Sequence, residues 1–317
     1  MHCTGKAPFI RFAQAHARVG ALASMKIAFC SRWLSHVCLL ALLFLPASAS
    51  ASVQKLGPDL YAYVSQDDSS ANSTFLVTDK GILVVDTGLN QAQGRKLLAE
   101  IRKISAAPVR WIVNTHYHPD HRGGNSTVGP DATIISSSYT RERVIQSDPA
   151  QYGMNFVVHG ETWLYVGDHK ALIYEPGPAH TLGDLVVYFP DEQTIATGDL
   201  FLTNSCPAMD EGDMENWIHA LDHMLTLRLA HVVPGHFETA TSAQLKRFRD
   251  YLAALRDQVA SMYRDGLPLQ QVKQRISLPQ FKDFRQFPKY EATFADNAEA
   301  YYHQLQRRVN SKTPTPP

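Results

Sequence analysis

Four potential metal ligands occur within six residues of this chain: His116, His118, Asp120 and His121. Imidazole and carboxylate groups are ligands with which proteins bind zinc. Three more candidates each follow an apolar run that meets a glycine-containing turn: His180, Asp199 and His236. A site with two metals needs about six protein ligands and a group that bridges the ions. These seven residues are therefore sufficient for a two-metal site.

The spacing within the first group indicates how its side chains are shared. Residues 111–113 are apolar and predict a buried strand that leads into the group. Side chains alternate along an extended chain, so His116 and His118 point to one side and can bind one metal. The same alternation would put Asp120 on that side. Pro119 bends the chain, so that His121 reaches a neighbouring position. One short segment can therefore supply ligands to two metals.

The elements that must position these residues alternate along the chain. Strands are predicted at residues 53–64 (a strand or hairpin), 73–77, 82–85, 111–113, 133–135, 163–166, 171–174, 185–189, 194–197 and 232–233. Helices are predicted after the capping residues Asn90 and Asp213, and over 139–146, 242–264 and about 290–309. Residues 148–161 lack periodicity and predict a loop, either a connector or a substrate lid. The alternation favours α/β layers around one core.

The first 51 residues have the organisation of a secretory signal peptide. They contain five basic residues and no acidic residue, then an apolar run at 37–45 and a run of small residues that ends at Ala51. Met25 is an alternative start, which would make residues 1–24 an over-extension of the reading frame. We expect a periplasmic or secreted protein with no stable membrane association after cleavage. The competing interpretation is an uncleaved membrane anchor.

Removal of this leader changes the charge and the cysteine content. The whole chain has 30 basic and 30 acidic residues, so the remainder carries a net charge of about −5. This charge disfavours a nucleic-acid partner and leaves a small molecule as the expected substrate. Only Cys206 remains, which excludes an internal disulfide. We expect Cys206 to be a buried, inert thiol.

The motif His116-x-His118-x-Asp120-His121, followed by His180, Asp199 and His236, resembles that of the metallo-β-lactamase superfamily. The resemblance covers about residues 53–238 and includes the segments 85–88 and 177–184. It implies a four-layer αββα sandwich with the metals at one edge of two packed sheets. It also implies two Zn²⁺ ions per chain, one held by His116, His118 and His180 and the other by Asp120, His121 and His236. In this assignment Asp199 bridges the ions.

The chemistry expected from such a site is hydrolysis. Zinc lowers the pKa of bound water toward about 7, which supplies a metal-bound hydroxide at neutral pH. Asp120 is the expected catalytic residue, because it can orient this hydroxide while it binds metal. A bridging Asp199 is typical of glyoxalase II-like and general hydrolases, so we expect cleavage of an ester, thioester, lactone or amide bond.

The sequence leaves three alternatives open. The first is β-lactamase activity of the His-rich type, which the bridging aspartate makes less favoured. The second is a persulfide dioxygenase with one iron ion on the same fold. The third is a binding protein that keeps the fold without catalysis.

The expected domain boundaries follow the same reasoning. Residues 52–240 form the metallo-β-lactamase domain, residues 241–310 form C-terminal helices that pack on it, and residues 311–317 form a disordered tail. Specificity is expected to depend on residues 148–163 and 200–213. Side chains that could line the substrate pocket are Phe201, Met209 and Trp217. Asp86 and His231 could each orient a metal ligand, or could simply cap a turn or end a strand.

Overall fold

Twelve strands in the described residues form two sheets that pack face to face. The computed structural model describes residues 52–147 and 154–312. The first sheet has the order β1-β2-β3-β4-β5-β6-β7. Its strands are β1 (Ser52–Lys55), β2 (Leu60–Val64), β3 (Ser73–Thr78), β4 (Gly81–Val85), β5 (Val109–Val113), β6 (Thr133–Ser137) and β7 (Met154–Val158). Strands β1 to β4 are antiparallel neighbours, and β4 to β7 are parallel neighbours.

The second sheet has the order β12-β11-β10-β9-β8. Its strands are β8 (Glu161–Val166), β9 (His169–Tyr174), β10 (Val186–Phe189), β11 (Thr194–Ala196) and β12 (His231–Val233). All pairs are antiparallel except β11 with β12, which run parallel. Since β5, β11 and β12 are each followed directly by predicted metal ligands, the direction of these strands brings the ligand-bearing loops together.

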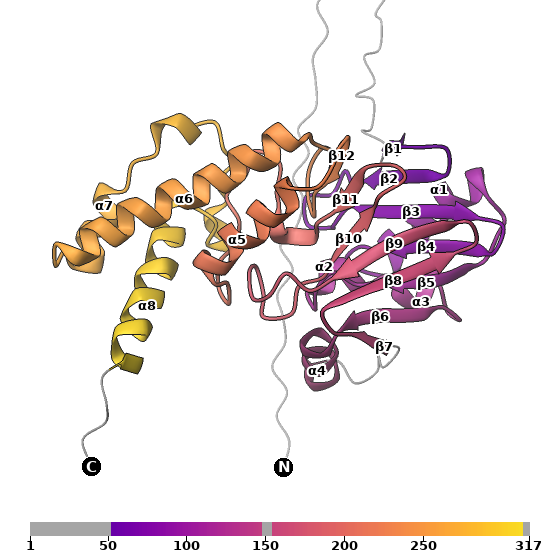
Figure 1. Cartoon of the computed structure of the whole chain (residues 1–317), viewed down its shortest axis with the longest axis horizontal. Helices are drawn as coiled ribbons and strands as arrows, with labels where there is room; N and C mark the ends of the chain where they lie inside the picture. The colour runs from indigo at the N-terminus through magenta and orange to yellow at the C-terminus, as the bar shows by residue number, and fades with distance from the viewer. Residues whose placement is uncertain (1–51, 148–153, 313–317) are drawn as a thin grey trace, which may run out of the picture. The chain divides into compact units, whose positions relative to one another are not determined.

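Three apolar layers show that the architecture is a sandwich of helix, sheet, sheet and helix (Figure 1). One layer lies between the sheets and includes Leu83 and Val113 from the first sheet and Val187 from the second. Another lies between the first sheet and the helices α1 (Gln91–Ile104), α3 (Asn125–Val128) and α4 (Ser138–Ser147). The third covers the second sheet with the later helices. The predicted α/β sandwich is confirmed.

The later helices are α5 (Met214–Leu225), α6 (Ser242–Arg264), α7 (Leu269–Arg275) and α8 (Phe294–Lys312). The amphipathic pattern predicted α6 with its observed ends, and a capping box from Thr241 to Gln244 begins it. Asn90 and Asp213 cap α1 and α5 as predicted. Among the described residues, no helix combines the length and apolar character needed to cross a bilayer.

Three local expectations were wrong. Residues 154–158, expected within a loop, form strand β7, because pairing with β6 supplies the backbone hydrogen bonds that local periodicity could not reveal. The last helix begins at Phe294, not near Tyr290, and a separate helix α7 precedes it. The last helix, α8, also continues to Lys312, two residues into the expected disordered tail. The expected leader and residues 148–153 lie outside the described residues.

Truncation of Phe248 tests the packing of α6 on the second sheet. Its side chain is completely buried, and its ring lies near those of Phe201 and Trp217. We expect Phe248→Ala to lower the free energy of unfolding by about 3–5 kcal/mol, because it leaves a cavity. Urea denaturation measures this. The control Lys246→Ala, on the exposed face of the same helix, should change stability by less than about 1 kcal/mol. Equal effects of the two changes would contradict this packing.

Candidate metal centre

The seven predicted ligands come from loops and short helices that follow strands. His116 and His118 follow β5, and the short helix α2 (Pro119–Arg122) carries Asp120 and His121. His180 lies between β9 and β10. Asp199 lies in the 3₁₀ helix η2 (Gly198–Leu200) directly after β11, and His236 follows β12. The structure brings all seven side chains together in two groups that share Asp199.

The first group consists of His116, His118, His180 and Asp199. Nε2 of His116 lies 2.9 Å from Nδ1 of His118, which in turn lies 3.3 Å from Nε2 of His180. Oδ2 of Asp199 lies 3.6 Å from Nε2 of His180. Three imidazole nitrogens and one carboxylate oxygen therefore face a common point.

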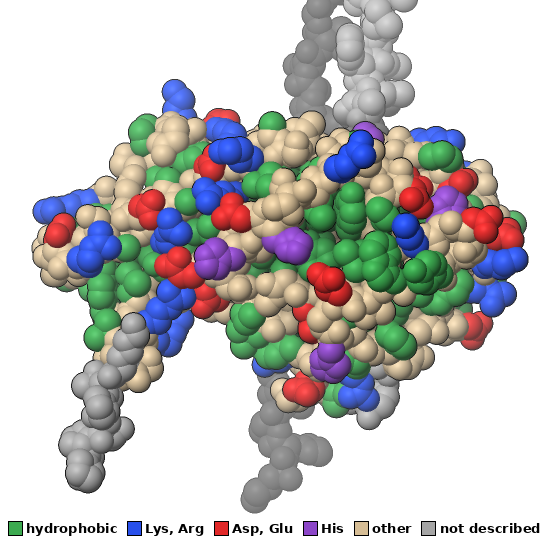
Figure 2. Space-filling model, in the orientation of Figure 1, with side chains coloured by type: hydrophobic (Ala, Val, Ile, Leu, Met, Phe, Trp, Pro, Cys, Tyr) green, Lys and Arg blue, Asp and Glu red, His purple; other side chains and the backbone are tan. Residues whose placement is uncertain are grey.

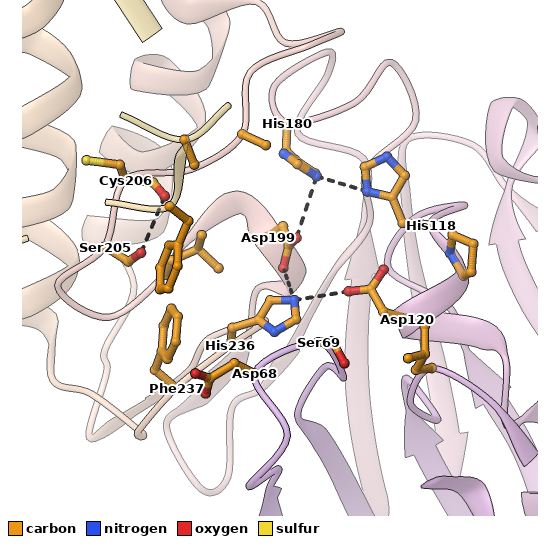
Figure 3. A pocket seen from close by; sticks show the side chains of 16 residues that line it. Asp68, Ser69, His118, Asp120, His180, Asp199, Ser205, Cys206, His236 and Phe237 are labelled. Atoms are coloured by element: carbon orange, nitrogen blue, oxygen red, sulfur yellow. Dashed lines mark hydrogen bonds and ion pairs between the residues drawn. The ribbon is translucent and has the colours of Figure 1, made fainter. Parts of the chain in front are cut away.

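The second group consists of Asp120, His121, Asp199 and His236. Nε2 of His121 lies 3.4 Å from Oδ2 of Asp120 and 3.3 Å from Oδ1 of Asp199. Nε2 of His236 lies 3.1 Å from the same oxygen of Asp120 and 3.6 Å from Oδ1 of Asp199. The two oxygens of Asp199 thus belong to different groups, as a bridging carboxylate requires (Figure 3).

These distances fit metal binding. Two ligand atoms at about 2.0–2.1 Å from a tetrahedral zinc ion lie about 3.3–3.4 Å apart, and the observed separations of 2.9–3.6 Å bracket that value. Within the described residues, Nε2 of His121 and Oδ1 of Asp199 are buried without a hydrogen-bond partner. Buried polar atoms are normally satisfied, so these two atoms, which lie 3.3 Å apart, fit a site that binds a cation.

The electrostatics differ between the two groups. Burial, assisted by the imidazoles of His121 and His118, holds the pKa of His116 well below its ordinary value. Burial also lowers the pKa of His118 and brings that of His180 to about 4. These rings are therefore neutral near pH 7 and have a lone pair for a cation. In the second group burial opposes charge on His121, yet the carboxylates of Asp199, Asp120 and Asp86 raise its pKa well above the ordinary value.

Asp86 orients the ring of His121. Its Oδ2 accepts a hydrogen bond of 2.8 Å from Nδ1 of His121 when that nitrogen carries the proton. Asp86 also accepts hydrogen bonds from the backbone N–H and the hydroxyl of Thr115. With Nδ1 occupied, Nε2 of His121 is the atom that would bind a metal, with release of the proton that the raised pKa places there. Of the two interpretations for Asp86, the structure favours the one in which it orients a ligand.

Asp120 lies on a different side than the alternation of side chains predicts. The extended geometry ends at Pro119, where helix α2 begins, and a helix turns consecutive side chains by about 100° rather than 180°. Asp120 therefore joins His121 and not His116 and His118. The placement implied by the family resemblance agrees with this geometry, and the argument from alternation was wrong for this residue.

A pocket of about 370 Å³ opens onto both groups (Figure 3). Its lining includes five of the predicted ligands and a set of mostly apolar residues: Asp68, Ser69, Leu89, Pro119, Leu202, Ser205, Cys206, Ala208, Phe237, Phe287 and Ala292. Phe237 directly follows the ligand His236 in the sequence, so its place at the pocket could have been predicted from the sequence. Phe287 and Ala292 have no such signal, because they lie about fifty residues further along.

The other residues that the sequence singled out lie mostly away from the ligand groups. Phe201, Met209 and Trp217 are buried in the core that covers the second sheet and are absent from the pocket lining. His231 begins β12, where it pairs with Thr194, away from both ligand groups. Cys206 is a free, buried thiol whose pKa burial raises to about 12, as expected of an unreactive cysteine. It nevertheless lines the pocket.

Comparison with known proteins places this centre in context. The family model described as "Metallo-beta-lactamase superfamily" matches residues 67–236, more than half of the chain. A linear primary-alkylsulfatase from Pseudomonas sp. is 25% identical over 260 residues, which cover 63% of this chain and 48% of the relative. A type 2 metallo-beta-lactamase from Elizabethkingia meningoseptica is 22% identical over 214 residues, with 63% and 84% covered. The chain therefore spans about half the length of the alkylsulfatase.

Solved structures show the same fold. A metallo-beta-lactamase from Pontibacter korlensis superposes with a TM-score of 0.58 at 21% identity and covers 64% of this chain and 99% of that one. The inverting sec-alkylsulfatase Pisa1 from Pseudomonas sp. superposes with a TM-score of 0.68 at 16% identity, with 84% and 52% covered. The alkylsulfatase fold thus accounts for about a fifth more of this chain.

Replacement of Asp86 tests its role in orienting His121. We expect Asp86→Ala to weaken metal binding at the second group by about 10–100-fold, because His121 loses the partner that fixes its ring. Competition with a chromophoric chelator measures the affinity. The control Asp131→Ala, on the exposed turn before β6, should leave both affinities unchanged. Undiminished affinity in Asp86→Ala would rule out the orienting role.

Proposed function

Because the chain belongs to the metallo-β-lactamase superfamily, we propose that it is a two-metal hydrolase that cleaves an ester, thioester, lactone or amide bond. The single observation that carries this proposal is the position of Asp199, with one oxygen in each ligand group. A carboxylate in this position can hold two ions close together, and neighbouring ions act jointly on one reacting bond. The two named relatives are a sulfatase and a β-lactamase, both hydrolases.

In this proposal zinc is the metal, two ions per chain. His116, His118 and His180 would hold one ion, Asp120, His121 and His236 the other, and Asp199 both. When bound, the ions would supply a positive field that polarises water and the scissile bond. The imidazole and carboxylate donors suit zinc.

The protein's own side chains would orient and exclude water. Oδ2 of Asp120 contacts His236 and His121, which leaves Oδ1 to orient an attacking water and to take up its proton. The apolar lining of the pocket would remove bulk water from the reacting bond and so strengthen the local electrostatic interactions. Among the described residues, no Ser or Cys contacts a His in the manner of a protein nucleophile and its base.

A sulfate ester is the second candidate substrate. The similarity to alkylsulfatases favours it, as does the larger share of the chain that Pisa1 covers. Against it, the pocket lining has no Lys or Arg in the described part of the chain, and Asp68 lies at the pocket. The carboxylate of a β-lactam would meet the same lack of a cationic side chain. A neutral ester is therefore the favoured substrate.

The proposed location and partners remain those expected from the sequence: an exported enzyme with a small-molecule substrate and no nucleic-acid partner. Figure 2 supports the last point, because acidic and basic side chains are interspersed on the face shown and form no single basic surface.

Metal analysis is the first test. We expect zinc-loaded protein to hold about two zinc ions per chain. His180→Ala should hold about one, because it removes a ligand from the first group only. The control His223→Ala, on helix α5, should keep two. Inductively coupled plasma mass spectrometry measures the stoichiometry. One iron ion per chain, together with oxygen consumption, would support the dioxygenase alternative instead.

Activity on a substrate panel is the second test. We expect the zinc-loaded chain to hydrolyse neutral esters or lactones in preference to alkyl sulfates and β-lactams. Asp120→Asn should lower kcat/KM by about 100-fold or more, because the amide cannot accept the proton from water. Asp131→Asn serves as the matched control. The absence of hydrolysis of every ester, thioester, lactone, amide, sulfate ester and β-lactam in the panel would refute the proposed function.

A further inference from the structure

The C-terminal extension contributes part of the pocket wall. Between α7 and α8 the chain passes through a 3₁₀ helix, η4 (Pro288–Tyr290), and places Phe287 and Ala292 in the pocket lining. Both residues lie outside the segment matched by the family model. We call residues 285–292 the C-terminal strap. This part of the pocket wall therefore lies outside the segment that the family model matches.

Backbone hydrogen bonds fix the C-terminal strap against the pocket. Phe287 and Ala292 exchange two of them, of 3.0 and 3.2 Å, which close the strap into a tight turn. The N–H of Arg285 donates to the carbonyl oxygen of Asn204, and the N–H of Cys206 donates to that of Arg285. A wall held in this way is preformed, so a ligand need not order it on binding.

Two stacked aromatic rings form part of this wall. The rings of Phe237 and Phe287 are parallel within 6°, with their centroids 5.8 Å apart. The guanidinium of Arg285 lies 4.4 Å from the ring centroid of Phe237. Its charge is engaged by Glu238 and by the carbonyl of Thr203, so Arg285 supports the ring and does not enter the pocket lining.

Phe237 is also held in an unusual backbone conformation. Its φ of +73° lies in the left-handed region, which costs a bulky residue free energy. The side-chain amide of Asn72 donates to the carbonyl oxygen of Phe237 at 2.7 Å and to that of Pro234 at 3.1 Å. The fold thus keeps this ring beside His236 in spite of the strain. A costly conformation at a pocket wall indicates a role in binding.

From these observations we infer that the pocket binds an uncharged hydrocarbon chain of the substrate, with its far end against Phe237 and Phe287 and its reacting end at the ligand groups. Leu89, Leu202 and Ala292 complete an apolar lining, and the described lining contains no cationic side chain for an anionic tail. The inference rests on the proposed function only where it calls the bound molecule a substrate. The apolar subsite itself follows from the lining.

Binding of neutral alcohols tests the subsite without any need for turnover. The probes are 1-butanol, 1-hexanol and 1-octanol, measured by isothermal titration calorimetry on the zinc-loaded protein. Burial of one methylene contributes about 0.8 kcal/mol, which is about a fourfold decrease in Kd. We therefore expect Kd to fall about 16-fold for each pair of added carbons until the pocket is full. The diol 1,8-octanediol, with a polar far end, should bind more weakly than 1-octanol.

Two substitutions of Phe287 assign the effect to the C-terminal strap. Phe287→Ala should reduce the gain per methylene to less than twofold, because it removes one of the two stacked rings against which the chain would pack. Phe287→Trp should shift the tightest binding to a shorter alcohol, because it fills the far end. Phe156→Ala is the matched control, since this ring is exposed on β7, and it should keep the wild-type series. Circular dichroism shows whether each variant is folded.

The outcomes separate this inference from the proposed function. A Kd that does not change from 1-butanol to 1-octanol, or wild-type series in both Phe287 variants, would overturn the subsite. If the alcohol series holds but the substrate panel shows no hydrolysis, the proposed function fails while the subsite stands. If esters are hydrolysed with no dependence of kcat/KM on chain length and the alcohols do not bind, the subsite fails while the proposed function stands.

Discussion

The carboxylate of Asp199 is the group on which the rest of the site depends. Its two oxygens lie in different ligand groups, so its position fixes the separation and orientation of both. Two glycines make this position accessible. Gly198 has a φ of +52°, and a side chain there would contact Thr115. A Cβ atom on Gly235 would collide with Oδ1 of Asp199. The turn after β12 therefore approaches the turn after β11 too closely for a side chain at position 235.

The two ligand groups differ in how the protein prepares them. The first is a group of three imidazoles that burial keeps neutral. The second contains more carboxylates, and Asp86 fixes the ring of His121 from behind. Since a neutral imidazole binds a cation through its free lone pair, the first group is preorganised by burial and the second by hydrogen bonding. One short segment supplies both because β5 ends in extended chain and then turns into α2.

The C-terminal helices have a second consequence beyond stability. They cover the second sheet through α5 and α6, and the C-terminal strap then returns to the pocket. Residues about fifty positions beyond the last ligand thus contribute to the wall. In the proposed enzyme the segment matched by the family model supplies the metal ligands, and the added segment contributes Phe287 and Ala292 to the apolar surface that would select a substrate.

The sequence by itself determined the identity of the seven candidate ligands, the α/β class and the helix at 242–264, since residue type and local periodicity are sufficient for each. Tertiary structure alone decided three things. Helix α2 turned Asp120 toward His121, pairing with β6 made residues 154–158 a strand, and the C-terminal strap brought Phe287 beside Phe237. Each depends on contacts between distant segments, or on the point where an extended chain becomes helical. Spacing reports which residues are neighbours along the chain, whereas only the folded backbone determines which ones face a common point.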